Sequence, residues 1–148
     1  MPEAPLQPMK RLIPTPLDEI RWIELPSHEE TRGVLTVVEG ARDLPFQIRR
    51  VYLLHHLSGE RGGHAHKRTR QLIIPASGTC ALDLFDGAET RTYHFNDPRR
   101  GLLLGPMVFI RLYDFSPGAT VVVLASTHYN HAHTIRSRHE YLQAIGKA

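Results

Sequence analysis

Two histidines separated by one residue are the strongest chemical signal in the sequence. They are His64 and His66, in the run RGGHAHK at residues 61–67. Alternate side chains of a β-strand point to the same face, so both imidazoles would enter one cavity. Such a pair suits two chemistries, the binding of a metal ion or the transfer of protons near neutral pH.

The metal alternative needs further ligands, and the sequence offers few. The stretch resembles the first cupin motif, in which metal-binding members carry a Glu after His-x-His and a later fourth ligand, His. This chain has Gln71 at the first position and no histidine in the segment GLLLGPMVFIR at residues 101–111. Stable zinc or iron sites usually need three or four donors. We therefore expect no metal.

A second His-x-His, His131 and His133, follows the last expected strand. We expect it to lie in a solvated surface loop, and it is the one place from which a further metal donor could come. The proton-transfer alternative instead leaves His64 and His66 free, because an imidazole near its usual pKa supplies both base and acid at neutral pH.

The charge pattern narrows the class of ligand. The net charge is only +3, and the basic residues form separate clusters at residues 49–50, 67–70 and 99–100. Nucleic-acid-binding surfaces usually carry a basic stripe interleaved with exposed aromatic residues, and no such stripe occurs, so we expect no nucleic acid. Isolated arginines suit a small anion such as a phosphorylated metabolite.

The elements that would position the histidine pair are short strands. Alternation and turn residues predict strands at residues 17–26, 34–39, 46–57, 80–85, 89–95, 102–104, 108–113 and 120–126, with an apolar run at 72–74. From Thr134 onward the pattern fits a single helix. This spacing predicts an all-β closed barrel, a jelly roll with a ligand cavity at its mouth and a short C-terminal helix.

One predicted strand carries polar groups into the expected interior. In residues 46–57, Phe46, Ile48, Arg50 and Tyr52 fall on one face. A barrel interior that was only a core would not hold an arginine without a charged partner, which indicates a site. The alternative is that Arg50 lies at the solvated end of an edge strand.

The length of the chain limits the number of domains. With 148 residues, the chain is expected to form one domain at residues 17–148, preceded by a proline-rich flexible arm at residues 1–16. The single cysteine, Cys80, cannot form an intrachain disulfide. No apolar run approaches the roughly 20 residues that span a membrane, and no secretory signal opens the chain. We expect a cytoplasmic protein without a membrane partner.

Taken together, these motifs closely resemble the sugar 3,4-ketoisomerases, the WxcM-like group of cofactor-free cupins that act on dTDP-4-keto-6-deoxyglucose. The resemblance extends from Thr31 to Leu142. Its most specific part is the run at residues 61–67, and the matches elsewhere are FQIRRVY at 46–52, Gln71, DG at 86–87, GPMV at 105–108, YDFS at 113–116, VLAS at 123–126 and IR at 135–136.

The resemblance implies an isomerase that moves a ketone from C4 to C3 of the sugar through an enediol. It implies that His64 and His66 are catalytic, one as the C3 base and the other as a relay between the oxygens. The resemblance also implies substrate-binding roles for two groups of residues. Arg50, Tyr52 and Gln71 would line the sugar pocket, and Arg32, Arg61 and Lys67 would hold the diphosphate. It further implies a homodimer with an exchanged N-terminal segment, and neither cofactor nor metal.

The chain departs from the family pattern at Phe109-Ile110, where a Trp followed by His or Arg is usual, and at residues 130–134. These departures leave the sugar and its stereochemistry open. Three alternatives stay open as well: a nucleotide-sugar 3,5-epimerase with Tyr113 or Tyr93 as acid, a metal-dependent cupin enzyme, and a cupin that binds a nucleotide-sugar without converting it.

Overall fold

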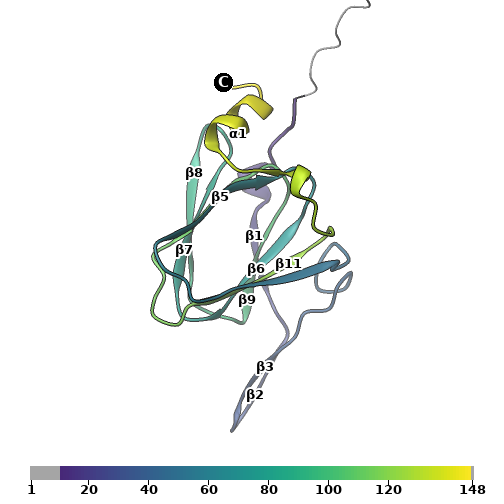
Figure 1. Ribbon diagram of the computed structural model, residues 1–148. Coiled ribbons are helices and arrows are strands. Elements are labelled where there is room, and N and C mark those ends of the chain that lie inside the picture. Colours follow the sequence, from purple (N-terminus) through teal and green to yellow (C-terminus); the bar gives the residue numbers. More distant parts are fainter. Residues whose placement is uncertain (1–10, 148) are drawn as a thin grey trace, which may run out of the picture.

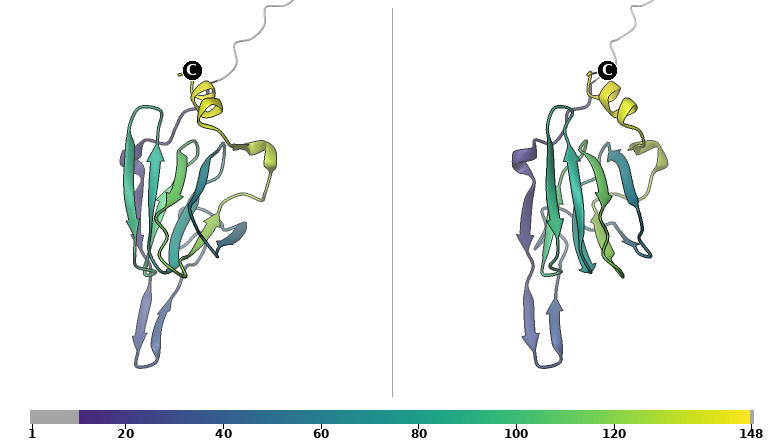
Figure 2. Two further views of the ribbon diagram at one scale, coloured as in Figure 1. Left: turned by 60° about the vertical axis from the view of Figure 1, so that its left-hand side comes forward. Right: turned by 90° about the vertical axis from the view of Figure 1, so that its left-hand side faces the viewer.

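A computed structural model describes residues 11–147, and two antiparallel sheets face each other in it as a flattened barrel (Figures 1 and 2). The first sheet contains, in spatial order, β1 (Arg21–Glu24), β9 (Arg100–Leu104), β6 (Gln71–Ser77), β11 (Thr120–Ala125) and β4 (Arg50–Leu54). The second contains β12 (Thr134–Ile135), β5 (Glu60–His66), β10 (Phe109–Tyr113), β7 (Cys80–Phe85) and β8 (Thr90–Phe95). The predicted all-β barrel is confirmed.

The turn between β7 and β8 shows how local sequence sets the register. Asp86 Oδ1 accepts hydrogen bonds from the backbone N–H groups of Ala88 and Glu89, at 2.9 and 2.8 Å. Gly87 has φ of +97°, which a side chain would strain. The two strands then pair from Phe85 with Thr90 to Cys80 with Phe95. The hairpin predicted from Asp-Gly is confirmed.

The barrel interior is filled by apolar side chains from both sheets over most of its length. The fully buried members include Leu82, Leu84 and Phe95 of the second sheet, and Leu102, Val121 and Val123 of the first sheet face them. Burial of a side chain of this size contributes about 1.5–3 kcal/mol. The packed interior holds the two sheets together and leaves polar groups at one end, where the histidines lie.

The predicted strand at residues 46–57 is wrong in its first part. The strand β4 begins at Arg50, and Phe46 lies outside the barrel, where it packs with Leu44 over Leu72 and Ile74 of β6. The outer face of the first sheet needs an apolar cover, and the loop before β4 supplies it. Phe46 therefore does not share a face with Arg50, although Tyr52 does.

The two strands predicted nearest the N-terminus also differ from those in the structure. The predicted strand at residues 17–26 is a 3-10 turn, η1 (Leu17–Glu19), followed by β1. Residues 34–39 contribute only β3 (Gly33–Thr36), which pairs with β2 (Ser27–Glu30) as a hairpin that projects away from the barrel (Figures 1 and 2).

The C-terminal helix α1 (Arg138–Ala144) begins later than the predicted residue 134 and covers the outer face of β5. The buried Tyr141 hydroxyl donates to the carbonyls of Phe85 and Met107, at 3.1 and 2.8 Å. Of the predicted N-terminal arm, residues 1–10 lie outside the described residues; Leu12 N–H donates to Ala144 O at 2.9 Å. No helix of the described chain is long and apolar enough to cross a membrane.

Candidate active site

The strand β5 directs both histidines into the barrel. A bulge at Gly62 and Gly63, with φ of +106° and +69°, precedes them and shifts the pairing with β10. A Cβ on Gly62 would lie 2.6 Å from the Ile110 carbonyl oxygen, so the close approach requires glycine. Beyond the bulge the strand alternates: Ala65 lies beneath α1, whereas His64 and His66 face inward with ring centroids 5.0 Å apart.

The opposite wall comes from β4 and β6. Arg50 and Tyr52 face inward from β4, and Gln71 of β6 is only 1% exposed behind them. The Gln71 amide donates to the Tyr52 hydroxyl at 2.7 Å. The Arg50 guanidinium lies 5.5 Å from the Tyr52 ring centroid and 5.7 Å from that of Tyr129, which holds it between two aromatic faces.

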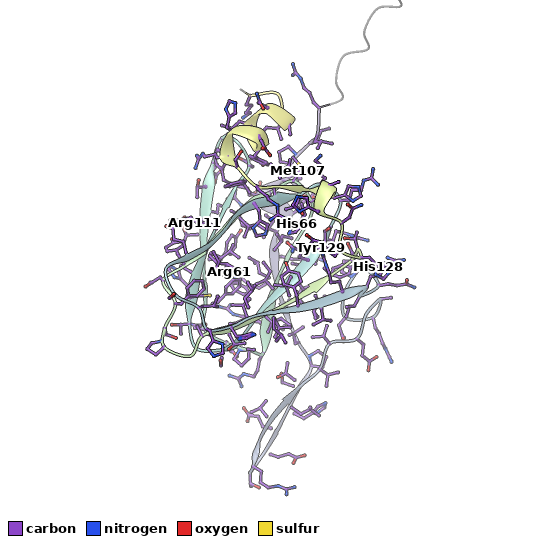
Figure 3. The ribbon with its side chains drawn as sticks, viewed as in Figure 1. Arg61, His66, Met107, Arg111, His128 and Tyr129 are labelled. Carbon is purple, nitrogen blue, oxygen red and sulfur yellow. The ribbon has the colours of Figure 1, made fainter. Side chains whose placement is uncertain are left out.

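A cavity of about 290 Å³ brings these side chains together; it is lined by Arg50, Tyr52, Arg61, His64, His66, Tyr129, Thr134 and Arg136. Figure 3 labels Arg61, His66 and Tyr129 near the opening of the barrel, with Arg111 on the outer side of the second sheet. A neighbouring cavity of about 310 Å³ is lined by Glu60, Arg61, Gly62, Gly63, His64 and Arg136. The two cavities share Arg61, His64 and Arg136 as lining residues.

The cavity keeps its titratable groups uncharged apart from the arginines. The pKa of His66 is lowered to about 3, mainly by burial and to a smaller extent by the neighbouring His64, Arg50 and Arg136. Burial also lowers the pKa of His64, although a hydrogen bond with the Gly62 backbone opposes the shift. Burial raises the pKa of Tyr52 despite the nearby Arg50. At neutral pH both imidazoles are therefore available as bases.

Two buried polar atoms in this cavity have no hydrogen-bond partner among residues 11–147: Arg50 Nε and His66 Nε2. Buried polar atoms are almost always paired, and an unpaired one usually marks a place where a ligand or water binds. One is a cationic donor and the other belongs to a neutral imidazole. Together they suit an oxygen atom that carries developing negative charge and exchanges a proton.

The structure brings together most, but not all, of the residues predicted to form the site. His64, His66, Arg50, Tyr52 and Arg61 line one cavity, and Gln71 supports it through Tyr52.

The other two predicted binding residues lie elsewhere. Lys67 lines a different cavity with Arg11, Arg68 and His133. Arg32 lies in the turn between β2 and β3, at the tip of the projecting hairpin.

Three lining residues were missed: Tyr129, Thr134 and Arg136. They come from the segment after β11, which returns along β5 so that Thr134 pairs with His66 and Ile135 with Ala65. A two-residue strand is too short to produce an alternation that sequence inspection detects. Ile135-Arg136 is part of the family resemblance, but no local pattern predicts a place for Arg136 at the cavity.

Phe109 and Ile110, which depart from the family pattern, point to opposite faces of β10. Phe109 faces outward and packs against Tyr141, with ring centroids 5.4 Å apart. Ile110 faces inward, is 2% exposed and lies directly opposite His64 in the pairing of β10 with β5. The wall beside His64 is therefore apolar at this position.

The second His-x-His forms a short 3-10 turn, η2 (His131–His133), and contains no buried residue, as the predicted surface location requires. Its histidines diverge: His131 Nδ1 contacts Arg136, and His133 lines the cavity that contains Lys67. Across residues 11–147, no group of three or more His, Cys, Asp or Glu side chains is arranged to hold a metal ion.

The comparisons with known proteins agree with this geometry. Residues 18–146 match the family model FdtA, described as WxcM-like, C-terminal. The curated TDP-4-oxo-6-deoxy-alpha-D-glucose-3,4-oxoisomerase of Aneurinibacillus thermoaerophilus is 35% identical over 120 residues, which cover 80% of this chain and 86% of that protein.

Solved structures extend the match. A 3,4-ketoisomerase from Helicobacter canadensis is 32% identical with a TM-score of 0.83, covering 86% of this chain and 97% of that one. A mutant of the 3,4-ketoisomerase QdtA from Thermoanaerobacterium thermosaccharolyticum, in complex with TDP-4-keto-6-deoxyglucose, is 32% identical with a TM-score of 0.84, covering 88% and 96%.

Proposed function

The chain belongs to the WxcM-like family, and we propose that it is a 3,4-ketoisomerase that moves the ketone of a dTDP-linked 4-keto-6-deoxyhexose from C4 to C3. The observation that carries the proposal is the pair of neutral, inward-facing imidazoles, with the unpaired Arg50 Nε and His66 Nε2 in the same cavity. These are the groups that a proton shift between two adjacent carbons requires.

The reaction needs two proton transfers at carbon and two at oxygen. A base removes the proton from C3, which is acidified by the adjacent C4 carbonyl, and the C4 oxygen gains a proton to give the enediol. The C3 hydroxyl then loses its proton as the C3 carbonyl forms, and C4 gains a proton. No electron acceptor is consumed. His64 and His66 act as base and as relay, because their rings are neighbours on one face.

The opposite wall stabilises the charge that develops on the substrate oxygen. Arg50 supplies a fixed cation that forms no ion pair with a described carboxylate, held between the Tyr52 and Tyr129 rings. The Tyr52 hydroxyl is oriented by Gln71. Preorganised donors in a site that excludes water typically contribute about 10²–10³-fold to the rate. Arg61, at the rim, is placed to bind the diphosphate.

The two tyrosines predicted as the acid of an epimerase, Tyr113 and Tyr93, lie outside this cavity. Tyr113 donates to Asp83 at 2.9 Å on the outer face of the second sheet, and Tyr93 packs against Trp22 with ring centroids 6.2 Å apart. Neither lines the histidine cavity. Tyr52 does line it, but it lies on the wall that holds Arg50 and Gln71, where it serves the oxygen atoms of the sugar.

We also propose a homodimer. The strand β4 is an edge strand whose outward side chains, Val51 and Leu53, are 58% and 59% exposed, and the hairpin exposes Val34 (51%) and Leu35 (62%). An isolated two-stranded hairpin is marginally stable in water, and an open apolar edge favours pairing with another chain. A role for Arg32 at the hairpin tip stays a prediction that depends on this second copy.

Light scattering tests the dimer. The wild type should have twice the chain mass, and Leu53→Glu should shift the mass toward the monomer. A wild-type monomer at micromolar concentration would contradict the dimer and leave the assignment of the reaction untouched.

The product identifies the reaction. Incubation with dTDP-4-keto-6-deoxyglucose should give a 3-keto sugar, observed by NMR as loss of the C4 ketone carbon signal and appearance of a C3 ketone. A 4-keto product inverted at C3 or C5 would instead indicate an epimerase. Unchanged substrate with tight dTDP binding would indicate a binding protein, and activity lost with a chelator and restored by metal would indicate a metal-dependent enzyme.

A further inference from the structure

A second cavity lies between the N-terminal segment, the loop after β5 and the end of α1. Its volume is about 380 Å³, and its lining includes three basic side chains, Arg11, Lys67 and Arg68. No Asp or Glu of residues 11–147 lines it. The cavity shares no residue with the histidine cavity, so the mechanism above leaves it without a function.

Local backbone structure holds the basic side chains around this cavity. The Lys67 N–H donates to the His133 carbonyl at 2.8 Å, which continues the pairing of β12 with β5. Gly146 follows the last turn of α1 with φ of +79°, and a Cβ there would lie 2.7 Å from Nε of Arg11. Glycine at the helix end therefore lets the Arg11 side chain lie against it.

The three positive charges are not balanced within residues 11–147. The arginines that form ion pairs there are at other places, namely Arg42, Arg91, Arg99 and Arg111. Lys67 and Arg68 are neighbours in the sequence and Arg11 lines the same cavity, so like charges repel one another across it. All three side chains are exposed, so a ligand reaches them without opening the fold. An anion bound among them would remove the repulsion.

The rest of the lining selects the class of ligand. Without a carboxylate, the cavity offers a metal ion no anionic oxygen, and the carbonyls of residues 141–144 at the end of α1 already accept backbone hydrogen bonds. No Phe, Tyr or Trp of the described chain lines the cavity, so a nucleobase finds no ring to stack on. Arginine and lysine bind phosphate oxygens through charge-assisted hydrogen bonds.

We propose that this cavity binds a small phosphate-bearing anion, distinct from the substrate, through Lys67, Arg68 and Arg11. Lys67 and Arg68 belong to the loop after β5, whereas Arg11 belongs to the N-terminal segment, so the bound anion joins the two. The anion thereby fastens the N-terminal segment to the barrel. The proposal does not depend on the assigned reaction, because the histidine cavity contributes no residue to it.

Titration calorimetry with inorganic pyrophosphate tests the site. Lys67→Gln should weaken binding about 10-fold, because it removes a charge-assisted contact. The matched control is Arg138→Gln, whose guanidinium lies 4.0 Å from the Phe85 ring centroid at another cavity. This control should bind pyrophosphate within about twofold of the wild type. An equal loss in both variants would overturn the site, since the effect would then be one of overall charge.

Arginines of the histidine cavity also attract anions, so a further variant separates the two cavities. In Arg61→Gln, the component of pyrophosphate binding that Lys67→Gln weakens should keep its wild-type affinity. Pyrophosphate binding that is lost in Arg61→Gln and unchanged in Lys67→Gln would overturn the proposal. ADP should bind to the Lys67-dependent site no more tightly than pyrophosphate, and tighter binding would overturn the assignment to a small anion.

Trypsin cleaves after arginine, so the Arg11–Leu12 bond reports on the attachment of the N-terminal segment. Pyrophosphate should slow cleavage of this bond at least fivefold in the wild type and less than twofold in Lys67→Gln, as followed by mass spectrometry. Cleavage after Arg42, in the loop before β4, is the internal control and should keep its rate. Equal protection in both proteins, or equal protection at Arg42, would overturn the attachment.

Lys67→Gln should itself stabilise the fold when no anion is present. Relief of the repulsion should raise its melting temperature about 1–2 °C above that of the wild type. Pyrophosphate at ten times its Kd should raise the wild-type melting temperature by about 3–6 °C. If Lys67 were only a structural residue, the variant would melt below the wild type in both buffers, and that result would overturn the proposal.

Discussion

The two His-x-His motifs of this chain have the same spacing and opposite environments. His64 and His66 lie on β5, face the interior and have ring centroids 5.0 Å apart. His131 and His133 lie on the 3-10 turn η2, which contains no buried residue, and they diverge: His131 contacts Arg136, whereas His133 lines the cavity that contains Lys67. A spacing of two places side chains on one face of a strand, but not on a helical turn. The spacing acquires chemical meaning from the element and from the enclosing walls.

The largest expected difference between the motifs is catalytic. Replacing a general base typically lowers the rate about 10²–10⁴-fold, so His64→Asn and His66→Asn should lower kcat for the keto-sugar by at least that much. His133→Asn should leave kcat within about twofold. Circular dichroism should give the same spectrum for all three variants. Equal losses at His133 and His66 would show that the strand environment does not distinguish the motifs.

The middle residues of the two motifs make a matched comparison of packing. Ala65 is fully buried beneath α1, in contact with the cluster that contains Met107 and Tyr141, whereas Ala132 is exposed on η2. Ala65→Leu should lower the free energy of unfolding by about 1–3 kcal/mol through overpacking. Ala132→Leu should change it by less than about 0.5 kcal/mol. Urea unfolding measures both, and a similar change in the two would contradict the assigned faces of β5.

The third difference is a dependence of stability on pH. The pKa of His66 is lowered from 6.5 to about 3 in the folded state. The unfolded chain therefore binds the proton first, and stability is complete above pH 6.5 and falls as the pH decreases toward 3. The lowered carboxyl pKa values of Asp83, Asp86 and Asp97 act below about pH 4, so the interval from pH 4 to 6.5 reports on the histidines.

A variant of His66 isolates its contribution to the dependence of stability on pH. His66→Asn should flatten the slope of stability against pH in that interval by up to about 1.4 kcal/mol per pH unit. Guanidinium unfolding of the wild type and of His66→Asn at several pH values measures both slopes, and an unchanged slope in the variant would show that the imidazole is not held neutral by burial.

The same comparison explains how much could be predicted from the sequence. The barrel and the inward direction of His64 and His66 follow from periodicity, which depends only on the residues of one strand. Phe46 was assigned to the wrong side because an apolar residue suits the core and the outer cover of a sheet equally well. Arg136 and Tyr129 reach the cavity through a return of the chain onto β5, which is a tertiary contact without a local pattern.

The origin of the proton that the product gains at C4 tests the central claim most directly. In deuterated water, the wild type should convert dTDP-4-keto-6-deoxyglucose into a 3-keto sugar that carries deuterium at C4, as detected by NMR. His64→Asn and His66→Asn should give neither product nor deuterium. Deuterated 3-keto product from both variants would show that other groups move the protons. That result would contradict proton transfer by the histidine pair.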